Sequence, residues 1–384
     1  MILSVFDLNF TPLGMIEAYQ SCSWIRRFRS CGECQLSVPY SREALELLQV
    51  ENLLLQQNGT EAMCIATITL VKERSGADVI NVTAYSLLQW LNRRVVIRAY
   101  DKQSLTRQQI ICKLFRENVT APVDKKRILP YVTLRNRTAY PRMEKTEFAV
   151  DAYQPLLDII EPELEASEMG CIVTTDTAAR THTFDFRLPR DRTASSASPI
   201  IFSVDYGTLG EQEFIHSHEQ YYNTAYVTGG DIDSDNEEEQ AYKAAALQIV
   251  NDHLSGMNRR EILVTASDIR HEVEDDEGEK QILTVSQIRD RLQKRGKDEL
   301  LGNYKEESTF NGQIVETDSL VYLRDWNLGD RVTCVYDRWG LQADMVITEV
   351  VEEYTQKGRR ISATFGDGTP SFKKALCALI HRSA

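Results

Sequence analysis

The C-terminal part of the chain consists of short segments in which apolar and polar residues alternate. An Asn-Leu-Gly-Asp turn at 327–330 enters one such segment, and 345–350 and 360–365 form two more, the last of them closed by Gly366. Alternation with a period of two is typical of a strand with one buried face. Turns that recur about every ten residues predict a small antiparallel barrel or sandwich for this end of the chain.

Length and cysteine content bound the class of protein. The chain has 384 residues, enough for two to four domains with a well-buried core. The N-terminus has no basic region typical of a signal peptide, and no apolar run approaches the ~18 residues that cross a bilayer. Eight cysteines are spread along the chain. Without a leader sequence we expect them to be reduced, buried and apolar in behaviour.

The net charge of −13 is unevenly distributed. Residues 231–279 hold fifteen acidic and four basic residues, whereas 1–100 hold nine of each and 320–384 hold eight acidic and nine basic. One middle region therefore carries most of the acidity. Neither terminal region offers the basic patch that tight nucleic-acid binding requires.

The first half of the chain reads as two units. Residues 1–98 are mainly predicted strands, with a short helix at 42–48 that Ser41 caps. Residues 99–192 form a mixed unit with predicted helices at 104–118 and 153–167, the second interrupted at Pro162.

The second half reads as a barrel with an insertion. Strands at 200–204 and 223–227 begin it, and 320–384 complete it, so its two pieces are 193–230 and 320–384. Residues 231–319 form an acidic α+β insertion, with one predicted helix at 240–254. The predicted fold class is α+β and mainly β: two small antiparallel tube-type β-barrels and two mixed α+β domains, with the second barrel split by the insertion.

Two short motifs suggest metal or redox chemistry. Cys31 and Cys34 form a C-x-x-C pair, but it lies at a glycine turn between strands and lacks a second ligand pair. His216 and His218 share one face of a strand or loop, with Glu219 beside them, but no third metal ligand is evident. We interpret both motifs as structural.

Acidic and basic clusters are further candidate sites in the sequence. Residues 231–236 open like a calcium loop, but Asn236 replaces the glycine and Tyr242 the bidentate glutamate. The run 272–279 reads as a hairpin tip, although paired carboxylates could serve a glycosidase. A basic patch at 125–127 reads as a solvated turn. We predict no catalytic, cofactor-binding or metal-binding residues and no enzymatic activity, and leave open whether the loop near 231–239 binds calcium.

Several segments together resemble one protein family. They are Phe-Asp-Leu-Asn-Phe at 6–10, Leu-Gly-Met-Ile at 13–16, Trp-Ile-Arg-Arg-Phe at 24–28, Gly-Glu-Cys-Gln-Leu-Ser-Val-Pro at 32–39, the Asn-x-x-x-Val-x-Gly-Gly strand end at 223–230, the segment 259–269, and the closing barrel. In this order they resemble the tail-tip hub proteins of siphophages and prophages. That family is related to the N-terminal part of tail-associated lysins and to the baseplate hub of contractile tails. Cys34 stands where the family commonly has an aromatic residue, which favours a packing role for it.

The resemblance implies a function and partners. Such hubs are homotrimers whose barrels surround a channel that continues or closes the tail tube, anchors tip proteins and passes DNA without binding it. It implies contacts with the distal tail, tail tube and tape measure proteins, with receptor-binding or fibre proteins as further candidates. The expected location is the virion, after synthesis in the bacterial cytoplasm. Relatives often continue into a hydrolase domain, which this chain is expected to lack. Alternatives are a tail-associated cell-wall hydrolase or a receptor-binding tip protein.

Overall fold

The structure is a computed structural model in which strands predominate. It describes residues 1–72, 78–135, 145–150, 152–230, 245–267, 269, 272–274, 280–317, 320–336, 338 and 340–366. The prediction of a mainly β protein is confirmed. Among these residues no helix is both long and apolar enough to span a membrane.

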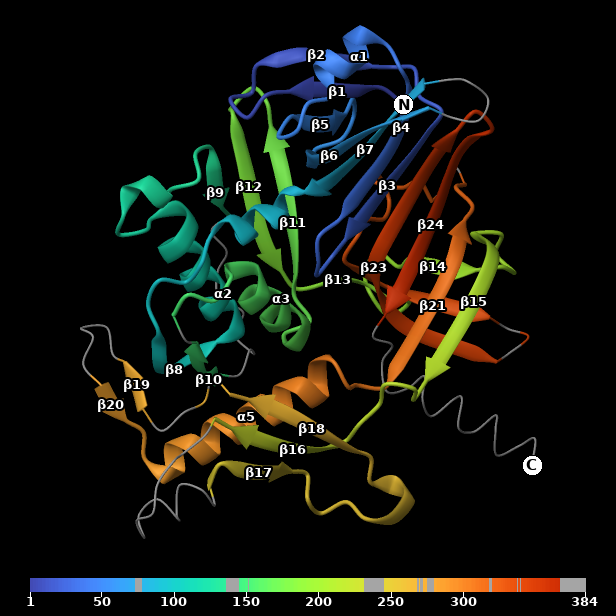
Figure 1. The fold of residues 1–384 in the computed structure, drawn as a ribbon. Coiled ribbons are helices and arrows are strands. Elements are labelled where there is room, and N and C mark those ends of the chain that lie inside the picture. The colour runs from blue at the N-terminus through green and yellow to red at the C-terminus, as the bar shows by residue number, and fades with distance from the viewer. Residues whose placement is uncertain are drawn as a thin grey trace.

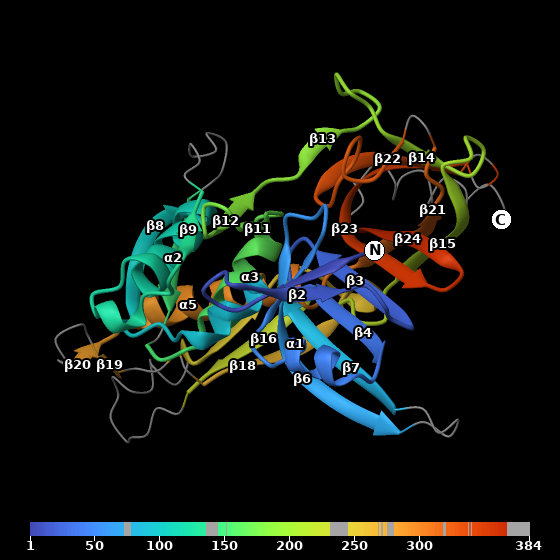
Figure 2. The same cartoon turned by 90° about the horizontal axis from the view of Figure 1, so that it is seen from above.

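One sheet of 14 strands dominates the molecule (Figures 1 and 2). Its N-terminal strand group comprises β1 (Leu3–Phe6), β2 (Pro12–Ile16), β3 (Ser21–Arg27), β4 (Glu33–Pro39), β5 (Leu53–Gln56), β6 (Ala62–Lys72) and β7 (Asp78–Ser86). Its C-terminal strand group comprises β13 (Arg190–Arg192), β14 (Ile201–Ser203), β15 (Leu209–Ser217), β21 (Glu307–Ile314), β22 (Asp330–Tyr336), β23 (Leu341–Thr355) and β24 (Gly358–Gly366). The strand order is β15-β21-β24-β23-β3-β4-β7-β6-β5-β1-β2, and β22 joins β13 and β14 to β23.

This sheet differs from the two separate barrels expected from the sequence. The two strand groups are joined by pairing between β3 and β23, so they form one continuous sheet. Seen from above, the C-terminal strands curl round one another (Figure 2). No ladder between described residues closes either group, because β2 pairs only with β1 and β15 only with β21.

Helical segments accompany the N-terminal group. Helix α1 (Arg42–Leu47) begins as predicted, because the Ser41 hydroxyl accepts a hydrogen bond from the Ala44 amide at 3.0 Å. A 3-10 helix, η1 (Leu87–Arg93), follows β7. Just after η1, Val95 forms an isolated antiparallel bridge with Pro155.

The mixed unit lies beside the N-terminal strands. It comprises β8 (Tyr100–Thr106), α2 (Arg107–Phe115), η2 (Arg116–Thr120), η3 (Lys125–Arg127), β9 (Val132–Leu134), β10 (Lys145–Val150), α3 (Leu156–Ala166), β11 (Gly170–Asp176) and β12 (Thr181–Arg187). Helix α2 starts three residues later than predicted, because Thr106 caps it and Ser104–Thr106 belong to β8. The expected interruption of α3 at Pro162 is wrong. The helix continues through the proline, since its apolar face is held in the core.

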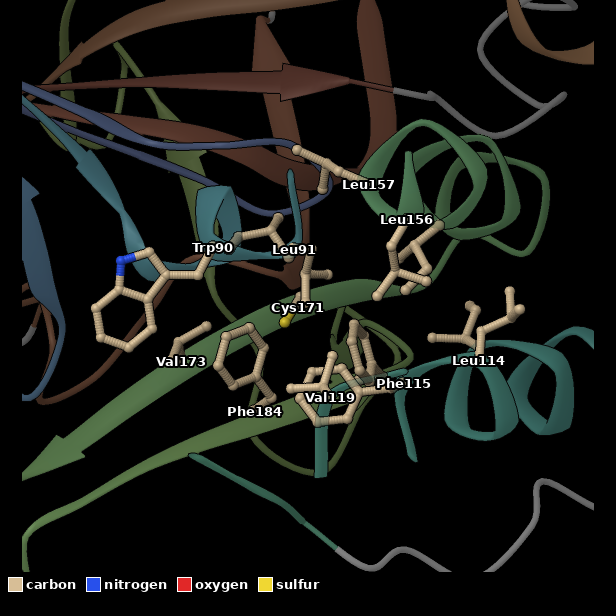
Figure 3. Close-up of a cluster of buried hydrophobic side chains, with 14 of the residues drawn as sticks. Trp90, Leu91, Leu114, Phe115, Val119, Leu156, Leu157, Cys171, Val173 and Phe184 are labelled. Atoms are coloured by element: carbon tan, nitrogen blue, oxygen red, sulfur yellow. The ribbon is translucent and has the colours of Figure 1, made fainter. Parts of the chain in front are cut away.

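The core of the mixed unit is shared with the N-terminal group (Figure 3). Helices α2 and α3 and strands β11 and β12 contribute Leu114, Phe115, Leu156, Cys171 and Phe184, all buried. The 3-10 helix η1 adds Trp90 and Leu91 to the same cluster. Burial of such side chains contributes roughly 1.5–3 kcal/mol each. The first two sequence-predicted units therefore fold around a common core.

A smaller unit lies below the mixed unit in Figure 1. It comprises β16 (Thr224–Gly229), β17 (Leu247–Val250), η4 (Gly256–Asn258), β18 (Glu261–Ala266), β19 (Glu272–Glu274), β20 (Lys280–Ile282) and α5 (Val285–Gly302), and we call it the α5 unit. Helix α5 packs its buried residues Ile288, Leu292 and Leu300 on β16–β18. Arg107 joins this unit to the mixed unit, because it contacts Glu163 of α3 at 2.8 Å and Asp298 of α5 at 3.2 Å.

Strand pairing corrects two assignments at the edges of the predicted insertion. Strand β16, expected in the second barrel, pairs instead with β17 and β18 of the α5 unit. Strand β21, expected in the insertion, pairs with β15 and β24 of the main sheet. The helix expected at 240–254 is also wrong where the structure describes it, because Leu247–Val250 form strand β17. Pairing with β16 prevails over the helix propensity of the local alanines.

Candidate functional site at the junction of the two strand groups

The two ends of the chain meet at a backbone ladder. Strand β23 is long enough to pair with β22 through its first half and with β3 through its second half. The β3–β23 register runs from Arg27 opposite Glu349 to Ser21 opposite Thr355. Arg27 Nε also contacts Glu349 Oε2 at 2.6 Å across the ladder. A continuous ladder fixes the register of these two strands, which lie more than 300 residues apart in sequence and belong one to each strand group.

Three chain segments converge on Phe28, which directly follows β3 and is fully buried. Its amide donates to the Thr348 carbonyl at 2.9 Å, and its carbonyl accepts from the Cys171 amide at 2.7 Å. Phe28 packs directly against the backbone of two glycines, where no larger residue fits. A Cβ added at Gly170 would lie 2.4 Å from a Phe28 atom, and one added at Gly329 would lie 2.3 Å from another. Gly329 also has a φ of +78°, a backbone conformation that favours glycine. The mixed unit and both strand groups therefore contact one phenylalanine.

A buried charge lies next to this junction. Arg26 of β3 is 6% exposed, and its Nε donates to Glu61 Oε2 at 3.0 Å. Its Nη1 donates to Asn327 Oδ1 at 3.0 Å and to the Tyr322 hydroxyl. Burial alone would lower the pKa of Arg26, but the charge of Glu61 and the contact with Tyr322 outweigh it and raise this pKa above its ordinary value. Arg26 thus links the N-terminal group to the segment before β22.

A second buried charge extends this network. Glu352 of β23 is 2% exposed and accepts from Arg359 Nη2 at 2.8 Å and from the Tyr354 hydroxyl at 2.7 Å. The guanidinium groups of Arg26 and Arg359 lie 5.8 Å and 5.9 Å from the centre of the Tyr322 ring. We call Arg26, Glu61, Tyr322, Glu352 and Arg359 the junction network. Sequence reasoning missed all of it, because its members are isolated in sequence and meet only through strand pairing.

The C-x-x-C pair is divided between two environments. Cys34 is fully buried in β4 with its Sγ 3.8 Å from Cys22 Sγ, whereas Cys31 is half-buried before that strand. Burial raises the pKa of the Cys31 thiol to about 12, and the contact with Cys22 followed by burial raises that of Cys34. Both thiols are therefore protonated at neutral pH and unsuited to redox or metal chemistry. The expected reduced, buried state fits five of the seven described cysteines, since Cys31 and Cys112 are half-buried; Cys377 lies outside the described residues.

The two histidines have a partner that the sequence did not reveal. His216 Nε2 and His218 Nε2 lie 3.3 Å and 3.0 Å from the same oxygen, Oε1 of Glu306. Glu306 directly precedes β21, the strand that pairs with the strand carrying His216. The signal that could have found it was the register of β15 with β21, and the sequence predicted neither strand over the paired residues.

Other sequence-predicted sites are placed only in part. The calcium-like loop at 231–236, with Tyr242, lies outside the described residues. Of the acidic run, Glu272–Glu274 form β19, which pairs with β20 as the predicted hairpin would, and 275–279 lie outside the described residues. Lys125–Arg127 form the 3-10 turn η3, with both lysines exposed. Among the described residues, the histidine pair with Glu306 is the cluster of groups that could hold a metal ion.

The fold as a whole matches solved phage tail proteins. It is similar to a tail protein from Neisseria meningitidis MC58, with a TM-score of 0.55 and 10% identity over 97% of this chain and 98% of that one. It is also similar to the 43 kDa tail protein of prophage MuSo2 from Shewanella oneidensis, with a TM-score of 0.52 and 11% identity over 95% and 97% of the two chains. The fold is therefore that of phage tail proteins.

Sequence comparison agrees with the fold. No curated protein matches the sequence significantly. Residues 2–367 match the family described as Siphovirus ReqiPepy6 Gp37-like protein. The chain therefore belongs to this family, and the resemblance to siphophage tail proteins found in the sequence is confirmed. At this level its function is that of a structural component of a phage tail.

Proposed function

We propose that this chain is the structural hub of a phage tail tip or baseplate, assembled as a homotrimeric ring that continues or closes the tail tube. The main support for the proposal is the β3–β23 ladder, which joins the two strand groups into one continuous sheet. A ring at the end of a tube must hold its strands in fixed orientation. The Phe28 contacts and the junction network add further links between the two strand groups beside the ladder, which supports this rigidity.

In this proposal each strand group forms one tube-type unit, so three chains present six around a channel. The first unit is β1–β7, and the second contains β13–β15 and β21–β24. Strands β2 and β15 are edges of the described sheet. Edge strands offer unpaired backbone groups to a neighbouring chain, so these edges are where we expect subunits to meet. The mixed unit and the α5 unit, with its acidic loops, would then lie on the outer side of the ring.

Charge supports a channel that passes DNA. Residues 1–100 have equal numbers of acidic and basic residues, and the acidity is concentrated at 231–279. A near-neutral wall would not retain DNA by releasing its counterions. We propose the distal tail, tail tube and tape measure proteins as partners of the ring, with receptor-binding or fibre proteins attached outside. The hub would be made in the bacterial cytoplasm and incorporated at the tail tip of the virion.

We propose that the hub has no enzymatic activity of its own. Two experiments separate this reading from a cell-wall hydrolase or a receptor-binding protein. Purified protein should bind the distal tail protein in a size-exclusion assay and should leave peptidoglycan intact in a zymogram. Clearing of the zymogram that is lost in His218→Ala or in a single carboxylate variant would establish a hydrolase. Binding to host cells without binding to the distal tail protein would establish a receptor-binding protein.

A further inference from the structure

Strand register explains why His216, His218 and Glu306 converge. His216 lies opposite Ser308 in the β15–β21 ladder, and Ser217 lies opposite Glu307. The next pair outward is therefore His218 and Glu306, on the same face as His216. An irregularity between Leu209 and Gln212 shifts the register by one residue. Without that shift, His218 would face Lys305 instead of Glu306, so the irregularity determines which side chain meets the histidines.

The distances from Glu306 to the two histidines match those between ligand atoms of one metal ion. Two ligand atoms that are each about 2.0 Å from a tetrahedral metal lie about 3.3 Å apart. The observed separations from Glu306 Oε1 are 3.3 Å to His216 Nε2 and 3.0 Å to His218 Nε2. All three ligand atoms lie within 4.8 Å of one another. Both histidines are exposed and Glu306 is half-buried, so a cation and its remaining water ligand can enter from solvent.

The identity of the donors selects the kind of cation. Two imidazole nitrogens and one carboxylate oxygen are a donor set that suits zinc and its neighbours in the first transition row. Calcium and magnesium prefer oxygen ligands only. We propose that His216, His218 and Glu306 bind one zinc-type divalent cation, with water completing the coordination. The sequence led us to expect no metal site, because it did not show the third ligand.

The position of the cluster gives the cation a structural role. The chain leaves the main sheet through 218–223 and returns through 303–306, and we call these two segments the neck (Figure 1). They run together, since the Tyr222 amide donates to the Tyr304 carbonyl at 3.0 Å and the two rings pack edge to face. His218 lies in the first segment of the neck and Glu306 in the second. A cation bound between them therefore links the two segments and fixes the α5 unit to the main sheet.

Neighbouring charges are arranged compatibly with a bound cation. Arg260 donates to the backbone carbonyl of His218 at 3.1 Å, and its guanidinium lies 5.8 Å from the Tyr221 ring. It therefore holds the backbone of one ligand. Lys305, next to Glu306, contacts Glu165 of the mixed unit. In these contacts Arg260 and Lys305 interact with groups other than the Glu306 carboxylate.

Metal titration of the untagged full-length chain tests the proposal. The protein is stripped with a chelator, and Zn²⁺ binding is measured by calorimetry in wild type, His218→Ala, Glu306→Gln and the exposed-histidine control His253→Ala. We expect one Zn²⁺ per chain, and an affinity reduced more than about tenfold in His218→Ala and Glu306→Gln, since even outer-shell partners of a ligand contribute about 10–100-fold. His253→Ala should bind as wild type does. Co²⁺ should give the visible absorption of a four-coordinate site.

The controls make each outcome decisive. Circular dichroism of the unliganded variants verifies that they fold, and saturating Zn²⁺ should raise the unfolding temperature of wild type and His253→Ala only. Absence of Zn²⁺ binding to folded wild type would overturn the proposal and leave the cluster as two imidazoles donating hydrogen bonds to one carboxylate. Equal binding by His218→Ala would also overturn it, and would assign the metal to cysteines or to another surface group.

Discussion

The ring of Phe28 lies so close to the backbone of Gly329 that a Cβ added there would be 2.3 Å from Phe28 Cε2. Gly329 directly precedes β22, and Phe28 directly follows β3, the strand that β23 pairs with, so this contact joins the two strand groups a second time. The φ of Gly329 is +78°, whereas that of Gly366, which closes β24, lies outside the left-handed region.

Replacing Gly329 by alanine should therefore destabilise the protein strongly. Backbone strain and the overlap with Phe28 together predict a loss of about 3 kcal/mol or more in the free energy of unfolding. Gly207 is a matched control, because its φ is +65° and nothing lies within 4 Å of its added Cβ. Gly207→Ala should cost only about 1 kcal/mol from strain. Equal losses for the two variants in urea unfolding would show that the Phe28 contact is unimportant.

Removing the charge of Arg26 should be costly, because Glu61 would lose its buried partner. Arg26→Met keeps most of the side-chain stem and should lower the free energy of unfolding by about 3–5 kcal/mol. The exposed pair Arg42–Glu46 is the control, since Arg42→Met should change stability by about 0.5 kcal/mol or less. The double variant Arg26→Met/Glu61→Leu should regain much of the loss. A double variant no more stable than Arg26→Met would contradict this explanation.

His182 should make the protein sensitive to acid. It is fully buried, its Nδ1 lies 3.0 Å from the Thr175 hydroxyl, and its ring stacks on Phe10. Burial lowers its pKa to about 4 from the ordinary 6.5. Between these values the unfolded chain binds the proton and the folded chain does not, so stability is fully present above pH 6.5 and falls as the pH decreases toward 4.

The loss that His182 contributes should approach about 3 kcal/mol near pH 4. Urea unfolding gives the free energy of unfolding of wild type and His182→Gln at a series of pH values between about 4.5 and 7. The contribution of His182 is the difference between the two slopes of this free energy against pH. His253→Gln, at an exposed position, should retain the wild-type slope. If His182→Gln also retained it, the acid sensitivity would have to come from other groups.

Val346→Asp tests the C-terminal wall. Val346 is fully buried in β23, at the pairing with Arg331 of β22 and Gly366 of β24. A carboxylate there should lower the free energy of unfolding by several kcal/mol and prevent joining to the tail tube. Val123→Asp, at a position that is 81% exposed, should leave stability and assembly unchanged. Normal tails from Val346→Asp, seen by electron microscopy, would mean that this sheet is not part of the tube wall.

Local elements of the fold were accessible from the sequence, whereas their long-range assembly was not. Ser41 signals its helix through a hydrogen bond within one turn. The alternating segments of β22–β24 contain the buried residues Val332, Val346, Val350 and Phe365, with Val335 half-buried. The β3–β23 ladder leaves no local signal, because either strand could have been an edge. Glu306 was missed for the same reason: its role depends on the register of β15 with β21.

The mass of the native assembly tests the hub most directly, and native mass spectrometry or light scattering measures it for the chain alone and with the distal tail protein. We expect three copies of the 43.8 kDa chain, about 131 kDa at micromolar concentration, and the same three copies in the complex. The α5 unit and its metal site play no part in this prediction, so it stands or falls independently of zinc. A single 43.8 kDa copy, both free and bound to the distal tail protein, would contradict the trimeric ring.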